Sequence, residues 1–239
     1  MTRCPTRETG WWCLSVSRLP AVGALLVVCL SLGACASGLL PKPQPQATLL
    51  VLEAPAADAL LRIPARQGQL PTQTQTQTQT QTPPLPLTLV VDTPRAAAGF
   101  DTRNIAYVRR AHEVEYFAVH QWVDTPARML APIMAQALQR RGSLRSVVLA
   151  PTAASGELRL ETELVRLHQD FTRSPSQVRL SLRVLLVDTA TRRALAWREL
   201  DAVAVSPSED PYGGAVAANA ALAQVLQQLV VFVAESSPK

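Results

Sequence analysis

Apolar and polar residues alternate along much of the second half of the chain, and this pattern predicts β-strands. Leucine and valine recur at every second position in 85–91 and again in 177–188, which gives each segment one apolar face. The other expected strands cover 47–53, 146–150, 156–171, 194–205 and two stretches within 104–122 on either side of a polar turn at 109–113. Together these strands are sufficient for one large sheet.

The apolar positions of 156–171 change phase in the middle of the segment. Alternate leucines share one face as far as Leu164, and the apolar series then resumes out of step at Val165. A β-bulge places one extra residue in a strand and shifts the alternation in this way. We therefore expect a bulge near Leu164.

A helical period replaces the alternation after residue 125. Apolar residues from Leu130 to Leu138 follow the i, i+3, i+4, i+7, i+8 spacing of one helix face. Thr125 is suited to cap the start of this helix and Gly142 to end it. Pro132 falls inside the helix, where it costs about 3 kcal/mol, and it predicts a bend.

A second, longer helix is predicted over 210–235, with the polar residues 208–210 as its cap. The resulting order is β-β-β-β-α-β-β-β-β-α. Segments in this order favour the α/β class, with an α+β-like arrangement in which helices pack on a mixed β-sheet. We expect a single domain over 47–235, followed by a short tail at 236–239.

The N-terminus has the layout of a secretory signal peptide. Arginines precede an apolar run at 21–32, and small residues follow it. The sequence Leu32-Gly33-Ala34-Cys35 resembles the bacterial lipobox, which implies removal of 1–34 and attachment of diacylglycerol and an acyl chain to Cys35. More than one acyl chain is needed for stable anchoring. The alternative is a membrane span over 19–41, whose second half is diluted by glycine, serine and proline.

Two polar segments follow this anchor. Residues 35–46 are rich in proline and glutamine and are predicted to form a flexible tether. The strict Thr/Gln alternation of 72–82 leaves no apolar face, so this stretch is interpreted as a low-complexity insert within the domain.

Candidate catalytic and metal-binding residues are sparse. All four cysteines lie within the first 35 residues, and the three histidines lie far downstream of them, so a Cys/His metal site is not expected. No nucleophile motif or phosphate-binding loop occurs. Glu161 and Glu163 share a strand face with Arg159, which indicates a solvated surface. The net charge of +5 is scattered, and this argues against nucleic-acid binding. We expect neither an enzyme nor a cofactor-binding protein.

The region from 85 to 235 resembles the ABC-type transport auxiliary lipoprotein family, that of the PqiC-like lipoproteins. The resemblance rests on DTRNIAYVR (101–109), EYFAVHQWVDTPARML (115–130), LETELVRLHQDF (160–171) and the helix AVAANAALAQVLQQL (215–229). It implies an α/β sandwich that acts without catalysis beside an inner-membrane ABC transporter and an MCE-domain protein, in the movement of lipid or other apolar cargo between membranes.

Trp122 and Trp197 are candidate contact residues for such a partner, because tryptophan is enriched at binding hot spots; the alternative is that both lie in the core. A partner or a second copy of the chain is also a candidate cover for the outer side of the last helix. The domain itself is alternatively a lipid carrier with an apolar pocket, or a structural outer-membrane assembly factor. Ala36 after the lipidated cysteine favours the periplasmic face of the outer membrane over the inner membrane.

Replacing Cys35 with serine should leave the protein either unprocessed or soluble in the periplasm, because the acylated thiol is the predicted anchor. Mass spectrometry of the mature N-terminus measures this. An unmodified N-terminus at another position in the unmutated protein would contradict the lipobox interpretation.

Overall fold

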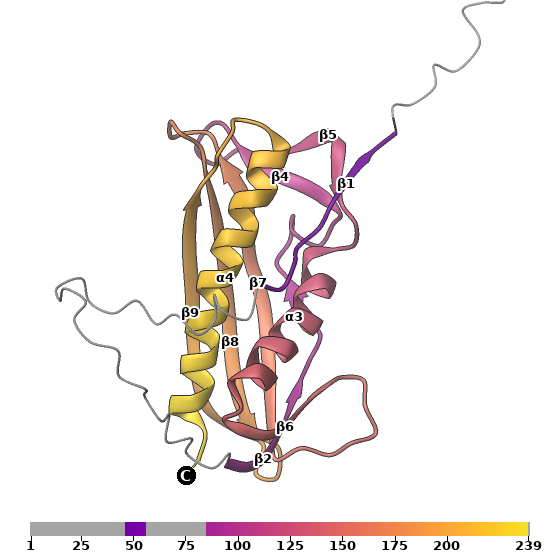
Figure 1. Ribbon diagram of the computed structural model, residues 1–239, viewed down its shortest axis with the longest axis vertical. Helices are drawn as coiled ribbons and strands as arrows, with labels where there is room; N and C mark the ends of the chain where they lie inside the picture. Colours follow the sequence, from indigo (N-terminus) through magenta and orange to yellow (C-terminus); the bar gives the residue numbers. More distant parts are fainter. Residues whose placement is uncertain (1–45, 56–84, 239) are drawn as a thin grey trace, which may run out of the picture. The chain divides into compact units, whose positions relative to one another are not determined.

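The computed structural model describes residues 46–55 and 85–238. The predicted signal peptide, Cys35, nearly all of the tether and the Thr/Gln insert therefore lie outside the described residues. The strands are β1 (Thr48–Leu50), β2 (Leu85–Val91), β3 (Arg95–Ala96), β4 (Asn104–Val108), β5 (Glu115–Trp122), β6 (Leu144–Leu149), β7 (Leu158–Asp170), β8 (Gln177–Asp188) and β9 (Arg193–Val205), and the helices are α3 (Pro126–Arg141) and α4 (Pro211–Ser236) (Figure 1). The predicted order is confirmed apart from the very short β3, which the alternation did not reveal.

Strand β7 connects the two halves of a mixed nine-stranded sheet. Along one edge it pairs with β8 antiparallel over its whole length. Along its other edge it pairs in succession with β2, β3 and β4, each of them parallel. The sheet continues from β8 to β9, from β2 to β6, and from β4 through β5 to β1. The predicted fold class is confirmed.

The predicted bulge lies in the middle of β7. Leu164 pairs with Leu182 and Arg166 pairs with Ser181, so Val165 is the extra residue. Because the bulge reverses the alternation, Leu164 and Leu167 face the same side of the sheet and are both buried.

Both helices lie on one face of the sheet (Figure 1). Helix α4 packs across β8 and β9, and α3 packs against β6. The core between sheet and helices includes Leu160, Leu182, Leu222, Val225 and Phe232. Among the described residues, no helix covers the opposite face of β7–β9. One layer of helices on one sheet is therefore the architecture of this part of the chain.

The helix ends follow the predictions in part. Gly142 ends α3 in the left-handed conformation, with φ of 68°, as expected for a C-terminal glycine. Thr125 occupies the N-cap position, but its side chain makes no cap hydrogen bond, so the expected capping contact is wrong. α3 continues through Pro132 without interruption. At α4 the predicted cap is confirmed, because the Asp210 carboxylate accepts a hydrogen bond of 2.6 Å from the Gly213 amide.

The first turn of α4 sits directly on a buried polar side chain of β7. Gln169 is only 2% exposed, and its Nε2 donates to Ser176 Oγ at 3.0 Å. A Cβ atom at Gly214 would lie 2.3 Å from Gln169 Oε1. Glycine at this position therefore sets how closely α4 approaches the sheet.

Gly214→Ala should destabilise the domain by about 1–3 kcal/mol, because the added methyl group overpacks a buried contact. The free energy of unfolding from urea denaturation is the measurement. In a helix without such a contact, glycine to alanine stabilises by about 1 kcal/mol. The sign of the change in unfolding free energy therefore shows whether the contact between Gly214 and Gln169 is tight. A stabilised variant would show that it is not.

Candidate partner-binding surface

The structure separates the two tryptophans that the sequence proposed as partner contacts. Trp122, at the end of β5, is 3% exposed and belongs to the core, so it is removed from the candidates. Trp197 on β9 is 68% exposed. It remains a candidate contact, now with a defined place on the sheet.

Trp197 lies on the face of the sheet that α3 and α4 leave open. Leu200, Ala202 and Ala204 of β9 are buried beneath α4, and residues of odd number from Trp197 onward point the other way because side chains alternate along a strand. Trp197 stands beside Leu185 of β8 in the pairing register. We call the side chains of this face along β8 and β9 the open-sheet surface: Leu185, Trp197, Glu199, Asp201, Val203 and Val205.

Acidic side chains occupy the middle of the open-sheet surface. Arg183 of β8 bonds to Glu163 at 2.7 Å and also lies 3.9 Å from Glu199. Arg95 of β3 lies beside Glu163 in the same row, so two guanidinium groups match the two carboxylates. In the next row, the Ser181 hydroxyl donates to the Asp201 carboxylate. On β9 the carboxylates of Glu199 and Asp201 are flanked by Trp197 on one side and by Val203 and Val205, which are 45% and 57% exposed, on the other.

Strand β9 also presents a backbone edge. It pairs with β8 only, and no other strand of the described ranges lies along its second edge. The Asp201 carbonyl is already occupied, since Gln228 Nε2 donates to it at 2.9 Å. A free strand edge can accept an additional strand from a partner. The surface thus combines an exposed aromatic, a mixed apolar and acidic pattern, and a strand edge.

The sequence contained a signal for this surface that alternation alone did not resolve. In 194–205 both sets of alternate positions include apolar residues. A strand buried on one face only should be polar on the other. The second apolar set is the open-sheet surface, which becomes visible once α4 is known to cover only one side.

Ion pairs, hydrogen bonds and burial account for the carboxylates and the histidine of β7. Glu163 pairs with Arg183, and Glu161 lies 3.7 Å from Arg95, which confirms the predicted solvated surface. His168 is partly buried, and its burial lowers the pKa of the imidazole below its ordinary value. Burial acts to raise the pKa of Asp170, but hydrogen bonds from Thr172 and the charge of Arg179 together lower it. Within 46–55 and 85–238, no three His, Cys, Asp or Glu residues cluster as metal ligands.

A cavity of about 10 Å³ lies beneath the start of α4, lined by residues that include Trp122, His168, Gln169 and Gly214. This space suits about one water molecule. Two lining atoms, His168 Nδ1 and Gln169 Oε1, have no protein partner in the described structure, and a water is suited to bond both. Ligand pockets for lipid-sized molecules occupy about 300–1,000 Å³, so this cavity does not accommodate an acyl chain.

Comparison with known proteins places the fold. A crystal structure of a Xanthomonas campestris protein superposes with a TM-score of 0.64 at 20% identity, covering 80% of this chain and 96% of the other. A crystal structure of an uncharacterized protein gives a TM-score of 0.53 at 14% identity, covering 63% of this chain and 95% of the other. At these identities the likeness shows the fold alone.

Sequence comparison gives the family. No curated protein sequence matches the chain. The sequence profile of the ABC-type transport auxiliary lipoprotein component family matches residues 69–233, which include every described element from β2 to most of α4. The chain therefore belongs to the family of ABC-type transport auxiliary lipoprotein components.

Proposed function

We propose that this protein is a periplasmic lipoprotein, anchored through Cys35, that serves as a non-enzymatic component of an ABC transport system of the MCE type for lipid or other apolar cargo. Its role is to bind the periplasmic MCE-domain protein. The observation that carries this proposal is the open-sheet surface, where Trp197 is exposed beside the edge of β9. The family membership supports the link to an ABC transporter.

The chemistry of the open-sheet surface suits a protein partner. Tryptophan is enriched among hot-spot residues, and the carboxylates of Glu199 and Asp201 provide charge complementarity for a basic side chain between two apolar contacts. A strand edge adds main-chain hydrogen bonds. An extended partner segment that alternates apolar and basic residues would use all three features.

The lipid anchor fits the same role. A domain tethered to a membrane meets a partner at the same membrane at high effective concentration, so that moderate affinity is sufficient. Ala36 after the lipidated cysteine favours the outer membrane, with the domain on the periplasmic side and the ABC transporter in the inner membrane. The MCE-domain protein would then be the contact that spans the distance.

The lipid-carrier alternative needs an enclosed apolar space for cargo. The cavity beneath α4 has a volume of about 10 Å³ and is lined partly by polar atoms. It supports a bound water rather than a lipid, and therefore favours the adaptor over the carrier. If the purified protein retains about one lipid molecule per chain after delipidation, the carrier would be favoured instead.

Trp197→Ala should weaken binding to the MCE-domain protein of the same operon by at least tenfold, because a central tryptophan of an interface contributes about 2 kcal/mol or more. Affinity measured by surface plasmon resonance with the purified proteins tests this. Tyr212→Ala is a matched control, since Tyr212 is 67% exposed but lies on α4, on the helix side.

The control should bind as the unmutated protein does, and both variants should keep the same unfolding midpoint. Equal affinities for the Trp197 variant and the unmutated protein would exclude the open-sheet surface as the contact. Failure of the unmutated proteins to associate, even after crosslinking, would exclude the adaptor role itself.

A further inference from the structure

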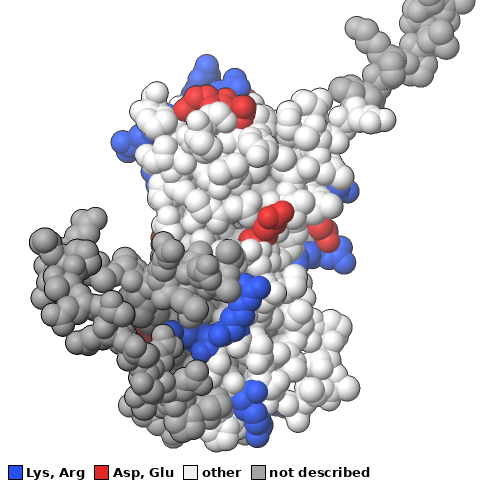
Figure 2. All heavy atoms as spheres, viewed as in Figure 1, with Lys and Arg blue, Asp and Glu red and all other residues white. Residues whose placement is uncertain are grey.

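Five exposed apolar side chains lie near the start of the described chain and at the start of α4. Leu49 and Val51 are 49% and 44% exposed, and Val123, Tyr212 and Val216 are 43%, 67% and 42% exposed. We call these five side chains the strap patch. Figure 2 shows the helix side and a broad area of its upper half without charged atoms.

Hydrogen bonds hold the parts of the strap patch together. β1 pairs in parallel with β5, and the Val123 amide donates to the Leu50 carbonyl at 2.9 Å. On the other side, Asn219 of α4 donates to the Val51 carbonyl at 3.1 Å and accepts from the Glu53 amide at 2.7 Å. Val216 and Tyr212 precede Asn219 by about one and two turns of the same helix. These bonds fix the segment that carries Leu49 and Val51 to the sheet and to α4.

Helix α4 extends this neutral character along its length. It carries no charged residue from Pro211 to Ala234, and by length and hydropathy alone it could cross a membrane. Half of its most apolar window is buried in the domain, which identifies it as the core helix. A helix on the surface of a soluble domain normally carries charges on its outer side. Gln224, Gln227 and Gln228 make the second half of this outer side polar, so its apolar part is the start of the helix with Tyr212 and Val216.

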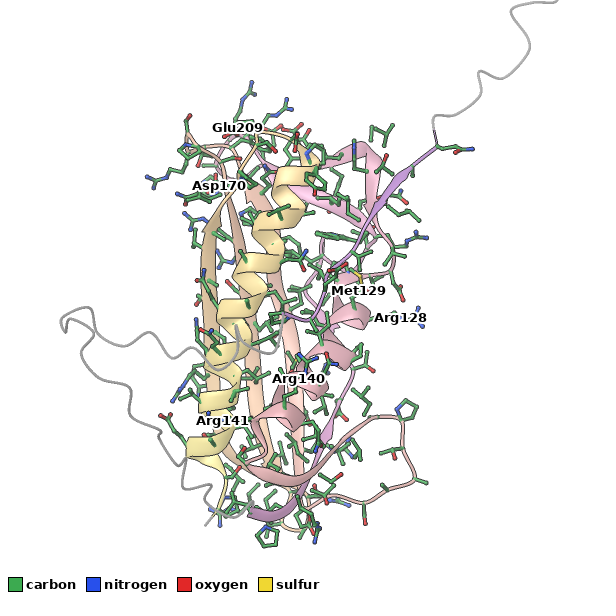
Figure 3. All side chains as sticks on the ribbon, in the orientation of Figure 1. Arg128, Met129, Arg140, Arg141, Asp170 and Glu209 are labelled. Carbon is green, nitrogen blue, oxygen red and sulfur yellow. The ribbon has the colours of Figure 1, made fainter. Side chains whose placement is uncertain are left out.

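The composition of the strap patch favours a bilayer over a protein as that environment. Four of its five members are leucine or valine, which are under-represented among the hot spots of protein interfaces, and the fifth is a tyrosine, which suits either kind of surface. Aliphatic residues with a tyrosine are typical of surfaces that enter the headgroup region of a membrane. Arg140 and Arg141 lie on the same side of the domain (Figure 3); Arg140 donates to the Pro55 carbonyl at 3.1 Å, and guanidinium groups at a membrane surface are attracted to anionic lipids.

The position of the strap patch in the chain brings it to a membrane. Thr48, the first residue of β1, follows Cys35 by 13 residues (48 − 35), a length that spans at most about 45 Å when fully extended. We propose that the strap patch rests on the bilayer that holds the Cys35 anchor and so fixes the orientation of the domain; this rests on the lipidation that the proposed function assumes. The anchor makes even a weak contact effective.

This orientation leaves the open-sheet surface free. Strap-patch residues Tyr212 and Val216 lie on the outer side of α4, whereas Trp197 lies on the opposite face of the sheet beneath that helix. The domain would present its helix layer to the lipid and its open sheet to the periplasm. Both contacts can therefore form at once.

Fluorescence from an environment-sensitive label distinguishes the two faces. All four cysteines of the chain fall within residues 1–35, so lipoprotein processing would leave an introduced cysteine as the one free thiol. The full chain is purified with its lipid, labelled with NBD at Val216→Cys or at Val203→Cys, and reconstituted into vesicles of phosphatidylethanolamine and phosphatidylglycerol. Val203, on the open-sheet surface, is the matched control because it is 45% exposed against 42% for Val216.

NBD at position 216 should become roughly twofold brighter and shift to the blue on reconstitution, since a contact with the interface removes water from the label. NBD at position 203 should not change. Adding Leu49→Asp and Val51→Asp to the Val216→Cys protein should abolish the response while the protein still floats with the vesicles. Circular dichroism checks that each variant is folded.

The outcomes separate this inference from the proposed function. If the protein floats with vesicles but the label at 216 responds no more than the label at 203, the strap patch does not contact the bilayer, and the anchor and partner role are unaffected. If the protein does not float, the Cys35 anchor is absent, and the bilayer contact fails together with the lipoprotein part of the proposed function.

Discussion

The pairing of β7 with four neighbouring strands is the interaction on which the rest of this domain depends. A single strand of 13 residues bonds to β8 along one edge and to β2, β3 and β4 along the other. The bulge at Val165 allows this length, because it lets the strand twist while Leu164 and Leu167 both remain in the core. Without β7 the strands beyond β2 and β4 would have no common sheet on which the helices could pack.

Because the helices cover only one face of the sheet, side chains alone must make the other face compatible with water. The strands β7 and β8 tolerate an open face because ion pairs cover it, such as Arg183 with Glu163 and Arg159 with Asp92. Such surface pairs contribute little to stability, but they keep the face soluble. On β9, the last strand of this side of the sheet, the open face carries the exposed apolar side chains of Trp197 and Val203 beside its charged residues. The exposed apolar residues of this strand are what a binding surface requires.

The sequence predicted those features that depend on local periodicity. The strands, the bulge near Leu164, the glycine at the end of α3 and the Asp210 cap follow from residues that are neighbours in the chain. The features that it missed depend on distant contacts. β3 has two residues and exists only because β7 pairs with it. Trp122 is buried because β5 shifts register against β4, where Asn104 pairs with Gln121 but Ala106 with Tyr116, and alternation along β5 does not reveal such a shift.

Helix α4 explains why the same domain can offer two different surfaces. Its buried side joins the core through Leu222, Val225 and Phe232, its first turn is fixed by Gly214 against Gln169, and Asn219 fastens the chain segment that leads back to the predicted anchor. Residues 51–53 are thus held against the helix that packs on the sheet. The predicted flexible tether over 35–46 would join this fixed segment to the proposed anchor, so the free length of chain would end at β1. With the proposed anchor in place, a short free length would keep the open-sheet surface near the membrane and raise its effective concentration for a partner there.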